Sequence, residues 1–187
     1  ETSRSKSRIY RGGLLDYEKA KKDILRWLKQ DKEAVVTTMF DLYALPDSFP
    51  GKKENKKITD PYKLVSILEE RFFEDINSET ECEKRFIPYI QLHEFEGLLF
   101  SDVEKIHEVM KVKTDERSKL VEISEKFNNP ELINQGSDTA PSKRLSNLYP
   151  GYDKITNGAI IASKIGLSEI RRKCSHFNEW LSKIESL

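Results

Sequence analysis

Apolar residues recur along the chain at two spacings, one typical of helices and one typical of strands. The stretch 16–30 has them at intervals of three and four, which predicts an amphipathic helix with Asp16 as its N-cap. A second helical pattern covers 61–75, where Asp60 can cap the N-terminus and Pro61 takes the first helical position. Each helix has one apolar face, so we expect both to pack against a sheet.

Two short runs, 34–40 and 86–92, have the β-branched and aromatic content of buried strands. The helix predicted at 61–75 separates them, and such a strand–helix–strand crossover implies parallel neighbours. Two strands alone make a poor sheet, so we expect a further strand, either before residue 1 or within the first dozen residues. The chain begins at Glu1 rather than Met, which favours the first option.

After residue 94 the apolar pattern is helical, and it predicts no further strand. Prolines and glycines divide this half into stretches with helical spacing. These stretches are 94–100, 102–111, 114–128, 141–149, 153–165, 167–173 and 176–186. The expected fold class is α/β: one domain over 1–187, with a small parallel sheet, flanking helices and a helical C-terminal half from about 94.

Composition limits the partners that this domain can take. Of its 187 residues, 37% are hydrophobic and 34% are charged, so a core fits under a heavily charged surface. Lys plus Arg and Asp plus Glu both number 32, so the net charge is zero and nucleic-acid contact would need a local basic patch. The basic residues within 1–13 form one such patch, and the alternative for them is a solvated tail.

Cysteine usage and hydropathy indicate a reducing, cytoplasmic environment. Cys82 and Cys174 lie far apart and match no metal-binding spacing, so we interpret them as free thiols. No apolar run approaches the ~18 residues of a transmembrane helix. No signal peptide is recognisable, and we therefore expect no membrane association.

Ionisable residues follow both predicted strands. Asp41 closes the first strand, and His93, Glu94 and Glu96 follow the second. The carboxyl ends of parallel strands meet at one edge of a sheet, where open α/β folds bind ligands. Carboxylates on two adjacent strand ends can share Mg²⁺, which can activate water for phosphodiester cleavage. The alternative is that Asp41 and the glutamates cap the loop and helix that follow them.

The spacing of the two glutamates leaves their roles open. If they lie on a helix they point to opposite sides, and Glu94 is then the better ligand because it is nearer the strand end. If the strand continues past 94, Glu94 and Glu96 share a face. His93 could be a partner of a metal ligand or a proton carrier, and a structural hydrogen bond is the alternative.

A second candidate site lies at the start of a later helix. Ser142, Lys143 and Arg144 follow Pro141, and free backbone N–H groups there would suit a phosphate. The alternative is a capped helix with a solvated basic face.

A third cluster, 173–178, contains His176 and could also be catalytic. The alternative is that Ser175 caps the last helix. A small-molecule enzyme with His93 or His176 as its base would need a closed apolar pocket, which the sequence does not indicate. No Gly-rich phosphate loop, Ser-His-Asp signature, zinc spacing or dinucleotide fingerprint occurs.

Several phrases of the sequence, taken in order, resemble a known family. They are 40–46 (FDLYALP) with 49–51, 88–96 (PYIQLHEFE) with 98–100, 133–134, 139–145 (TAPSKRL), 151–152 and 176–178. Together they resemble a prokaryotic domain-of-unknown-function family with a TOPRIM-like fold, whose members often stand beside ABC-type or OLD-like ATPases in phage-defence loci.

This resemblance implies a nuclease that uses Mg²⁺ or Mn²⁺ on DNA or RNA and works with such an ATPase. Asp41 matches the first aspartate of the family's Asp-x-Asp pair, and Tyr43 stands where the second would be. The glutamate of the family's first strand would lie before Glu1, so Glu94 or Glu96 would complete the metal site.

In this reading Lys143 and Arg144, with Ser142, would contact phosphate. The competing expectation is a non-catalytic module that binds a nucleotide or docks on a partner ATPase.

Overall fold

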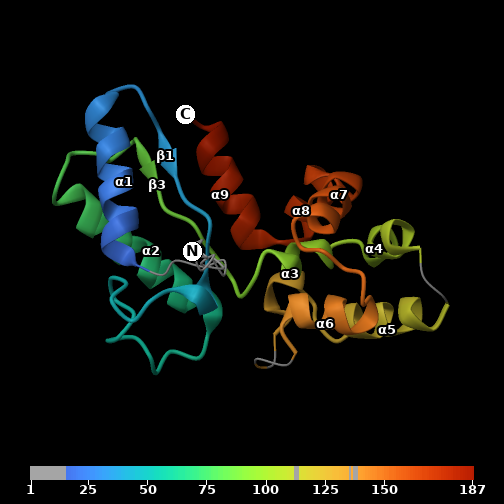
Figure 1. Ribbon diagram of the computed structural model, residues 1–187. Helices are drawn as coiled ribbons and strands as arrows, with labels where there is room; N and C mark the ends of the chain where they lie inside the picture. The colour runs from blue at the N-terminus through green and yellow to red at the C-terminus, as the bar shows by residue number, and fades with distance from the viewer. Residues whose placement is uncertain (1–15, 112–113, 135, 137–138) are drawn as a thin grey trace, which may run out of the picture.

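The chain forms a mixed α/β structure that is mostly helical, as a computed structural model shows for residues 16–111, 114–134, 136 and 139–187 (Figure 1). The basic arm at 1–13 lies outside these described residues. The elements are α1 (Tyr17–Gln30), β1 (Val36–Thr37), β2 (Phe40–Asp41), η1 (Leu42–Ala44), α2 (Pro61–Asn77), β3 (Phe86–Ile87), β4 (Ile90–Gln91), α3 (Glu96–Leu99), α4 (Val103–Met110), α5 (Thr114–Glu125), η2 (Pro130–Leu132), α6 (Pro141–Leu148), α7 (Thr156–Ile165), α8 (Leu167–Lys173) and α9 (Ser175–Glu185).

The two predicted strands are parallel neighbours on either side of α2, as expected. β1 pairs with β3 and β2 pairs with β4, with Phe40 opposite Ile90. Each run, predicted as one strand, is split into two short ones. The break lies at Tyr89, whose N–H donates to Thr38 Oγ1 at 3.1 Å instead of to a strand carbonyl.

The edge of β3 and β4 that faces away from β1 and β2 is closed to a further strand. The N–H of Ile90 donates to Oε1 of Glu69 on α2 at 2.7 Å, and that of Phe86 donates to the carbonyl of Cys82 at 3.1 Å. Pro88 lies between them and has no N–H. This edge therefore offers no free donor for strand addition.

Local capping fixes the first two helices as the sequence predicts. The Asp16 carboxylate accepts the N–H of Glu18, and the Asp60 carboxylate accepts the N–H groups of Tyr62 and Lys63. These caps satisfy donors that the first turn of a helix leaves unpaired. The apolar faces of both helices then pack on one side of the sheet (Figure 1).

Two hydrophobic clusters form the core, one on each side of the strands. The first contains α1, α2 and strand residues within 17–92, and the second contains the helical half from residue 98 onward. Tyr89 belongs to the second cluster, because its ring stacks on His176 at 5.0 Å and on Trp180 at 4.4 Å. Helix α9 therefore returns to the strands from the end of the chain, and Trp180 Nε1 donates to Thr37 Oγ1 at 2.8 Å.

The α-helices after residue 94 lie within the stretches predicted for them, except that α9 begins one residue early. The cap of the last helix, however, differs from the predicted Ser175. Ser175 is the first residue of α9 and makes no capping bond. Instead, the buried Glu131 carboxylate accepts the N–H groups of His176 and Phe177, at 3.1 and 2.9 Å. A glutamate 44 residues earlier in sequence than Ser175 thus performs the capping, which no local pattern could reveal.

Cys82 and Cys174 are both free and buried, as expected. Among the described helices, none combines the length and apolar character that crossing a bilayer requires.

Candidate functional site

The ends of β2 and β4 place the first candidate residues. Asp41 is the last residue of β2 and lies opposite Gln91 of β4. Two residues after β4, His93 has a φ of 62°, which turns the chain sharply away from the strand direction. Glu94 follows that turn, and Glu96 begins α3. The two glutamates therefore do not lie on one helix, so helical spacing does not force them to opposite sides.

Asp41, Glu94 and Glu96 come together, and we call them the carboxylate cluster. Burial raises the pKa of Asp41 to about 6; the charge of Lys154 opposes this shift, whereas Glu96 and Glu94 add to it. The pKa of a buried carboxyl rises when like charges lie close to it. Asp41, at the end of β2, thus interacts electrostatically with both glutamates that follow β4.

A buried ion pair lies at the centre of this site. Glu96 has no exposed side-chain surface, and the Lys154 ammonium lies 2.9 Å from its Oε2. Neither oxygen of Glu96 has a well-formed hydrogen bond, and the same is true of the buried Tyr152 hydroxyl beside it. Burial and the charge of Glu96 raise the pKa of Tyr152, which therefore stays protonated. Such unsatisfied buried oxygens are rare in proteins and often mark a place for an ion or water.

Close packing of α7 brings Lys154 to the cluster. A Cβ atom at Gly158 would lie only 3.3 Å from the Tyr152 hydroxyl and 3.5 Å from Cε1 of Phe95. Glycine at this position lets α7 approach α3 and the segment before it. Burial lowers the pKa of Lys154, but Glu96 and then Asp41 outweigh that effect, so it remains charged.

Glu94 occupies the N-terminus of α6. The backbone N–H of Ser142 donates to Glu94 Oε2 at 2.9 Å. The helix end that was predicted to hold a phosphate therefore binds a carboxylate of the protein itself. Lys143 is exposed, and Arg144 donates from Nε to the Thr139 carbonyl at 2.6 Å.

The guanidinium of Arg144 also lies over the ring of Phe127, 5.9 Å from its centroid. Its described contacts are thus with the segments before α6 and after α5. Ser142 is a member of the predicted phosphate site whose backbone N–H contacts the carboxylate cluster.

His93 and Tyr43 lie beside the cluster in different roles. Nδ1 of His93 lies 3.0 Å from the amide nitrogen of Asn134, and burial lowers the pKa of His93 although Glu94 opposes this. A neutral His93 accepts that hydrogen bond through Nδ1. This is the structural hydrogen bond that was predicted as the alternative to a role in metal binding or proton transfer. Tyr43 is 57% exposed, and burial, Glu94 and Asp41 raise its pKa.

Lys154 and Tyr152 were not among the residues singled out for chemistry. Tyr152 stands in one of the family-like phrases, but no motif links Lys154 to Glu96, which lies 58 positions earlier. Across residues 16–111, 114–134 and 139–187, no group of three or more His, Cys, Asp or Glu side chains is already arranged to hold a metal ion. Among the residues that the structure describes, Lys154 is the cation that pairs with Glu96.

Comparisons with known proteins bear on the family of the chain. Neither the curated proteins nor the solved structures contain a match to it. Residues 2–185 match the model of a family described as Domain of unknown function (DUF4276). That match spans both hydrophobic clusters and every residue of the carboxylate cluster, and the chain therefore belongs to the DUF4276 family.

Proposed function

We propose that the carboxylate cluster binds Mg²⁺ or Mn²⁺ and that the protein is a TOPRIM-like nuclease that hydrolyses phosphodiester bonds. The observation that carries this proposal is the state of Glu96. Its carboxylate is fully buried near Asp41 at the strand ends, and in the structure the half-exposed Lys154, 2.9 Å from Oε2, compensates its charge, a place that a divalent cation could take. A buried carboxylate without hydrogen bonds is costly unless a cation compensates its charge.

The donor set suits a hard divalent cation. Asp41 and Glu96 would supply oxygen ligands, and Glu94 would assist, with one oxygen already fixed by Ser142. Burial first, and then the charges of Glu96 and Glu94, raise the pKa of Asp41, and a bound cation would oppose both effects. When bound, the cation would lower the pKa of a water molecule and neutralise charge on phosphate.

Lys154 gives the site a positive group of its own. Its side chain is 48% exposed, so it can turn away from Glu96 without leaving a closed core. In the proposed nuclease it would then contact a phosphate oxygen of the substrate, as lysine does in many phosphate sites.

The resemblance supports the finer parts of the proposal. It favours a nucleic-acid substrate, DNA or RNA, and an ABC-type or OLD-like ATPase as partner in phage defence. Tyr43 takes the position of the second aspartate of the family-like pair. The proposal therefore assigns the missing carboxylate to the glutamates after β4.

The test combines cleavage with direct metal binding. Plasmid DNA, single-stranded DNA and tRNA are incubated with the protein and Mg²⁺ or Mn²⁺, with and without the partner ATPase, while calorimetry measures Mn²⁺ binding. We expect Asp41→Asn and Glu96→Gln to abolish cleavage and to weaken Mn²⁺ binding. Asp47→Asn is the matched control, since Asp47 is an exposed carboxylate that pairs with Lys56. Cleavage that survives both Asp41→Asn and Glu96→Gln would overturn the proposal.

A second candidate is a non-catalytic module that docks on the ATPase or binds a nucleotide. The Lys154–Glu96 ion pair favours it, because this pair already compensates the buried charge without a metal. The same experiment separates the two: this candidate requires that Mn²⁺ does not bind and that no cleavage appears even with the ATPase present.

A further inference from the structure

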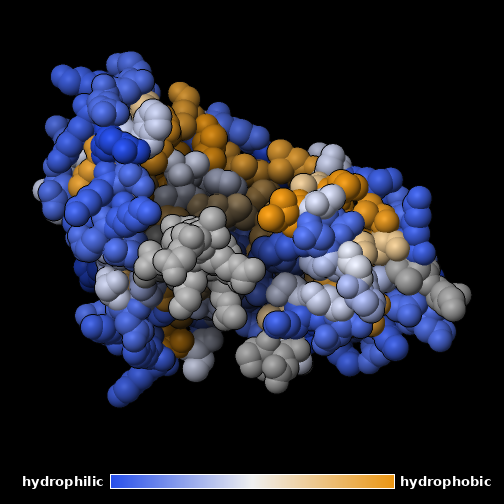
Figure 2. All heavy atoms as spheres, viewed as in Figure 1, coloured by the Kyte–Doolittle hydropathy of each residue, from blue (hydrophilic) through white to orange (hydrophobic). Residues whose placement is uncertain are grey.

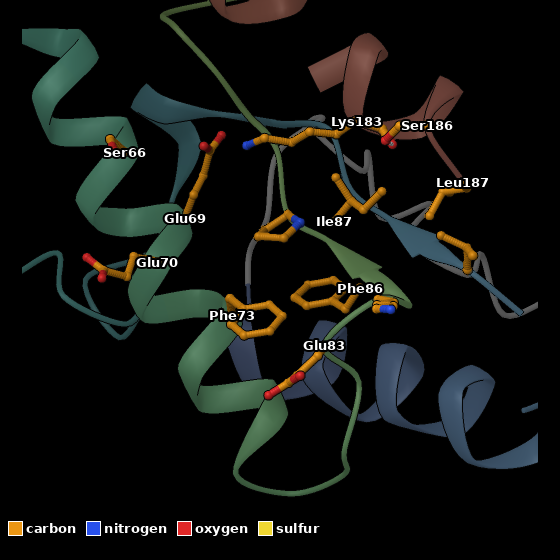
Figure 3. A pocket seen from close by; sticks show the side chains of 13 residues that line it. Ser66, Glu69, Glu70, Phe73, Glu83, Phe86, Ile87, Lys183, Ser186 and Leu187 are labelled. Carbon is orange, nitrogen blue, oxygen red and sulfur yellow. Dashed lines mark hydrogen bonds between the residues drawn. The ribbon is translucent and has the colours of Figure 1, made fainter. Parts of the chain in front are cut away.

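A cavity of about 910 Å³ lies between α2, β3 and the end of α9 (Figure 3). Its volume is in the range of small-molecule binding sites. No member of the carboxylate cluster lines it, so it is a separate feature of the molecule. The lining residues that matter here are Glu69, Phe73, Phe86, Ile87, Pro88 and Lys183.

Glu69 supplies a fixed negative charge on one wall. The residue is only 9% exposed, and its Oε1 accepts hydrogen bonds from the N–H of Ile90 at 2.7 Å and from Nε2 of His176 at 2.9 Å. Within the described part of the chain, Oε2 has no hydrogen-bond donor. One oxygen thus holds the carboxylate in place, and the other is available in the cavity.

Lys183 supplies a positive charge on the opposite side. Its side chain extends from α9 across the cavity, and its ammonium points toward the Glu69 carboxylate (Figure 3). Glu69 pairs with His176 at 2.9 Å, and among the described residues no ion pair joins Glu69 to Lys183. The charges of Glu69 and Lys183 therefore face each other in a cavity whose lining also includes Glu70, Glu83 and Lys84.

Apolar groups form the floor between these charges. The rings of Phe73 and Phe86 are parallel, with an interplanar angle of 9° and centroids 6.5 Å apart. Ile87 and Pro88 add apolar surface to the same lining. Such a floor would bury an aromatic or aliphatic side chain with a gain in free energy.

We propose that this cavity binds a small zwitterion with an apolar body, such as a free α-amino acid with an apolar side chain. The ligand's ammonium donates to Glu69 Oε2, its carboxylate meets Lys183, and its side chain packs on Phe73 and Phe86. A simple amine would meet the repulsion of Lys183, and a simple acid that of Glu69. A zwitterion is complementary to both charges.

The test compares three probes that share one phenyl ring. L-Phenylalanine carries both charges, phenethylamine carries the ammonium alone, and 3-phenylpropionate carries the carboxylate alone. Calorimetry and thermal shift with the full chain measure their affinities. We expect saturable binding of L-phenylalanine at millimolar concentrations and about tenfold weaker binding of each single-charge probe, since one charge-assisted hydrogen bond is lost.

Two substitutions assign the charges to residues. Lys183→Met should weaken L-phenylalanine about tenfold and leave phenethylamine no weaker, because the repulsive ammonium is gone. Glu69→Gln should weaken both amines and spare 3-phenylpropionate. Lys173→Met, an exposed lysine outside the cavity, is the matched control and should change nothing.

Lys183 is exposed, so Lys183→Met keeps the test decisive even if Glu69→Gln does not fold. Equal binding of the three probes, an unchanged affinity in Lys183→Met, or no saturable binding would each overturn the proposal. Asp41→Asn should bind L-phenylalanine normally, which makes the outcome independent of the proposed nuclease.

Discussion

The ammonium of Lys154 lies 2.9 Å from a carboxylate oxygen of Glu96, a side chain that has no exposed surface. This ion pair provides the buried Glu96 carboxylate with a cationic partner. The two residues come from different parts of the helical half, so the ion pair also links the segment before α7 to α3.

Removing the ammonium should destabilise the metal-free protein. Lys154→Met leaves the Glu96 charge buried alone, and we expect a loss of about 2 kcal/mol, less than for a fully buried pair because Lys154 is half exposed. Urea unfolding measures this loss. The double variant Lys154→Met/Glu96→Gln should recover most of it, and Lys143→Met, at an exposed site, should cost nothing. If Lys154→Met unfolds like the parent protein, the ion pair does not contribute to stability.

Neutralising Asp41 should stabilise the protein at neutral and higher pH. Its pKa is raised from 3.8 to about 6 in the folded state, so its charge favours unfolding once the pH exceeds that range. The contribution of Asp41 to stability is full below its unfolded pKa and is lost as the pH rises through about 6.

We therefore expect Asp41→Asn to gain about 2 kcal/mol near pH 8 without divalent metal, and to gain nothing near pH 4. Urea unfolding at both pH values checks this. An equal effect at the two values would show that Asp41 titrates normally.

Loss of the Glu131 carboxylate should detach the start of α9. It accepts the N–H groups of His176 and Phe177 and the hydroxyl of Tyr62 at 3.0 Å. Glu131→Ala should cost about 3 kcal/mol, because buried donors then lose a charged acceptor. Glu179→Ala, an exposed glutamate on the same helix, is the control. A cost within about 0.5 kcal/mol of that control would mean that water replaces the cap.

The Glu69–His176 pair should make stability depend on pH. Burial lowers the pKa of His176, but the hydrogen bond and charge of Glu69, together with Glu131 and Glu179, raise it above 6.5 overall. Because the folded pKa is the higher one, this contribution is full below the unfolded value and is lost as the pH rises through the folded value.

Tyr62 and Tyr89, the aromatic neighbours of His176, stay uncharged in that range because burial raises the pKa of both. An NMR titration of the histidine ring protons should show His176 with a midpoint above 6.5 and His93 with one below it. In Glu69→Gln the His176 midpoint should fall. A His176 midpoint at or below that of His93 would contradict the ion pair.

Helix ends that are fixed by hydrogen bonds between residues close in sequence could be predicted from the sequence. Asp16 and Asp60 cap α1 and α2 through bonds to residues two or three positions away, so the sequence itself contains the interaction. The split of the strands could not be predicted in the same way, because it depends on the Thr38 hydroxyl meeting the N–H of Tyr89, 51 positions later. Pro88 was the signal that the run 86–92 contained an interruption.

The carboxylate cluster shows the same limit. The sequence predicts that Asp41 and Glu94 lie at one edge of the sheet, because parallel strands end there together. The position of Lys154 could not be predicted from the sequence, since it depends on how closely α7 packs at Gly158. At Ser142 the physical expectation of an anion at a helix N-terminus was sound, but the anion is Glu94 of the same chain.

The division into two hydrophobic clusters has a consequence for how the protein is made. The first cluster is built from residues within 17–92, so it can condense while the ribosome is still producing the rest of the chain. Asp41 is already in place at that stage. Lys154, which compensates Glu96, emerges much later, so the carboxylate cluster gains its compensating cation only after the first cluster has been synthesised.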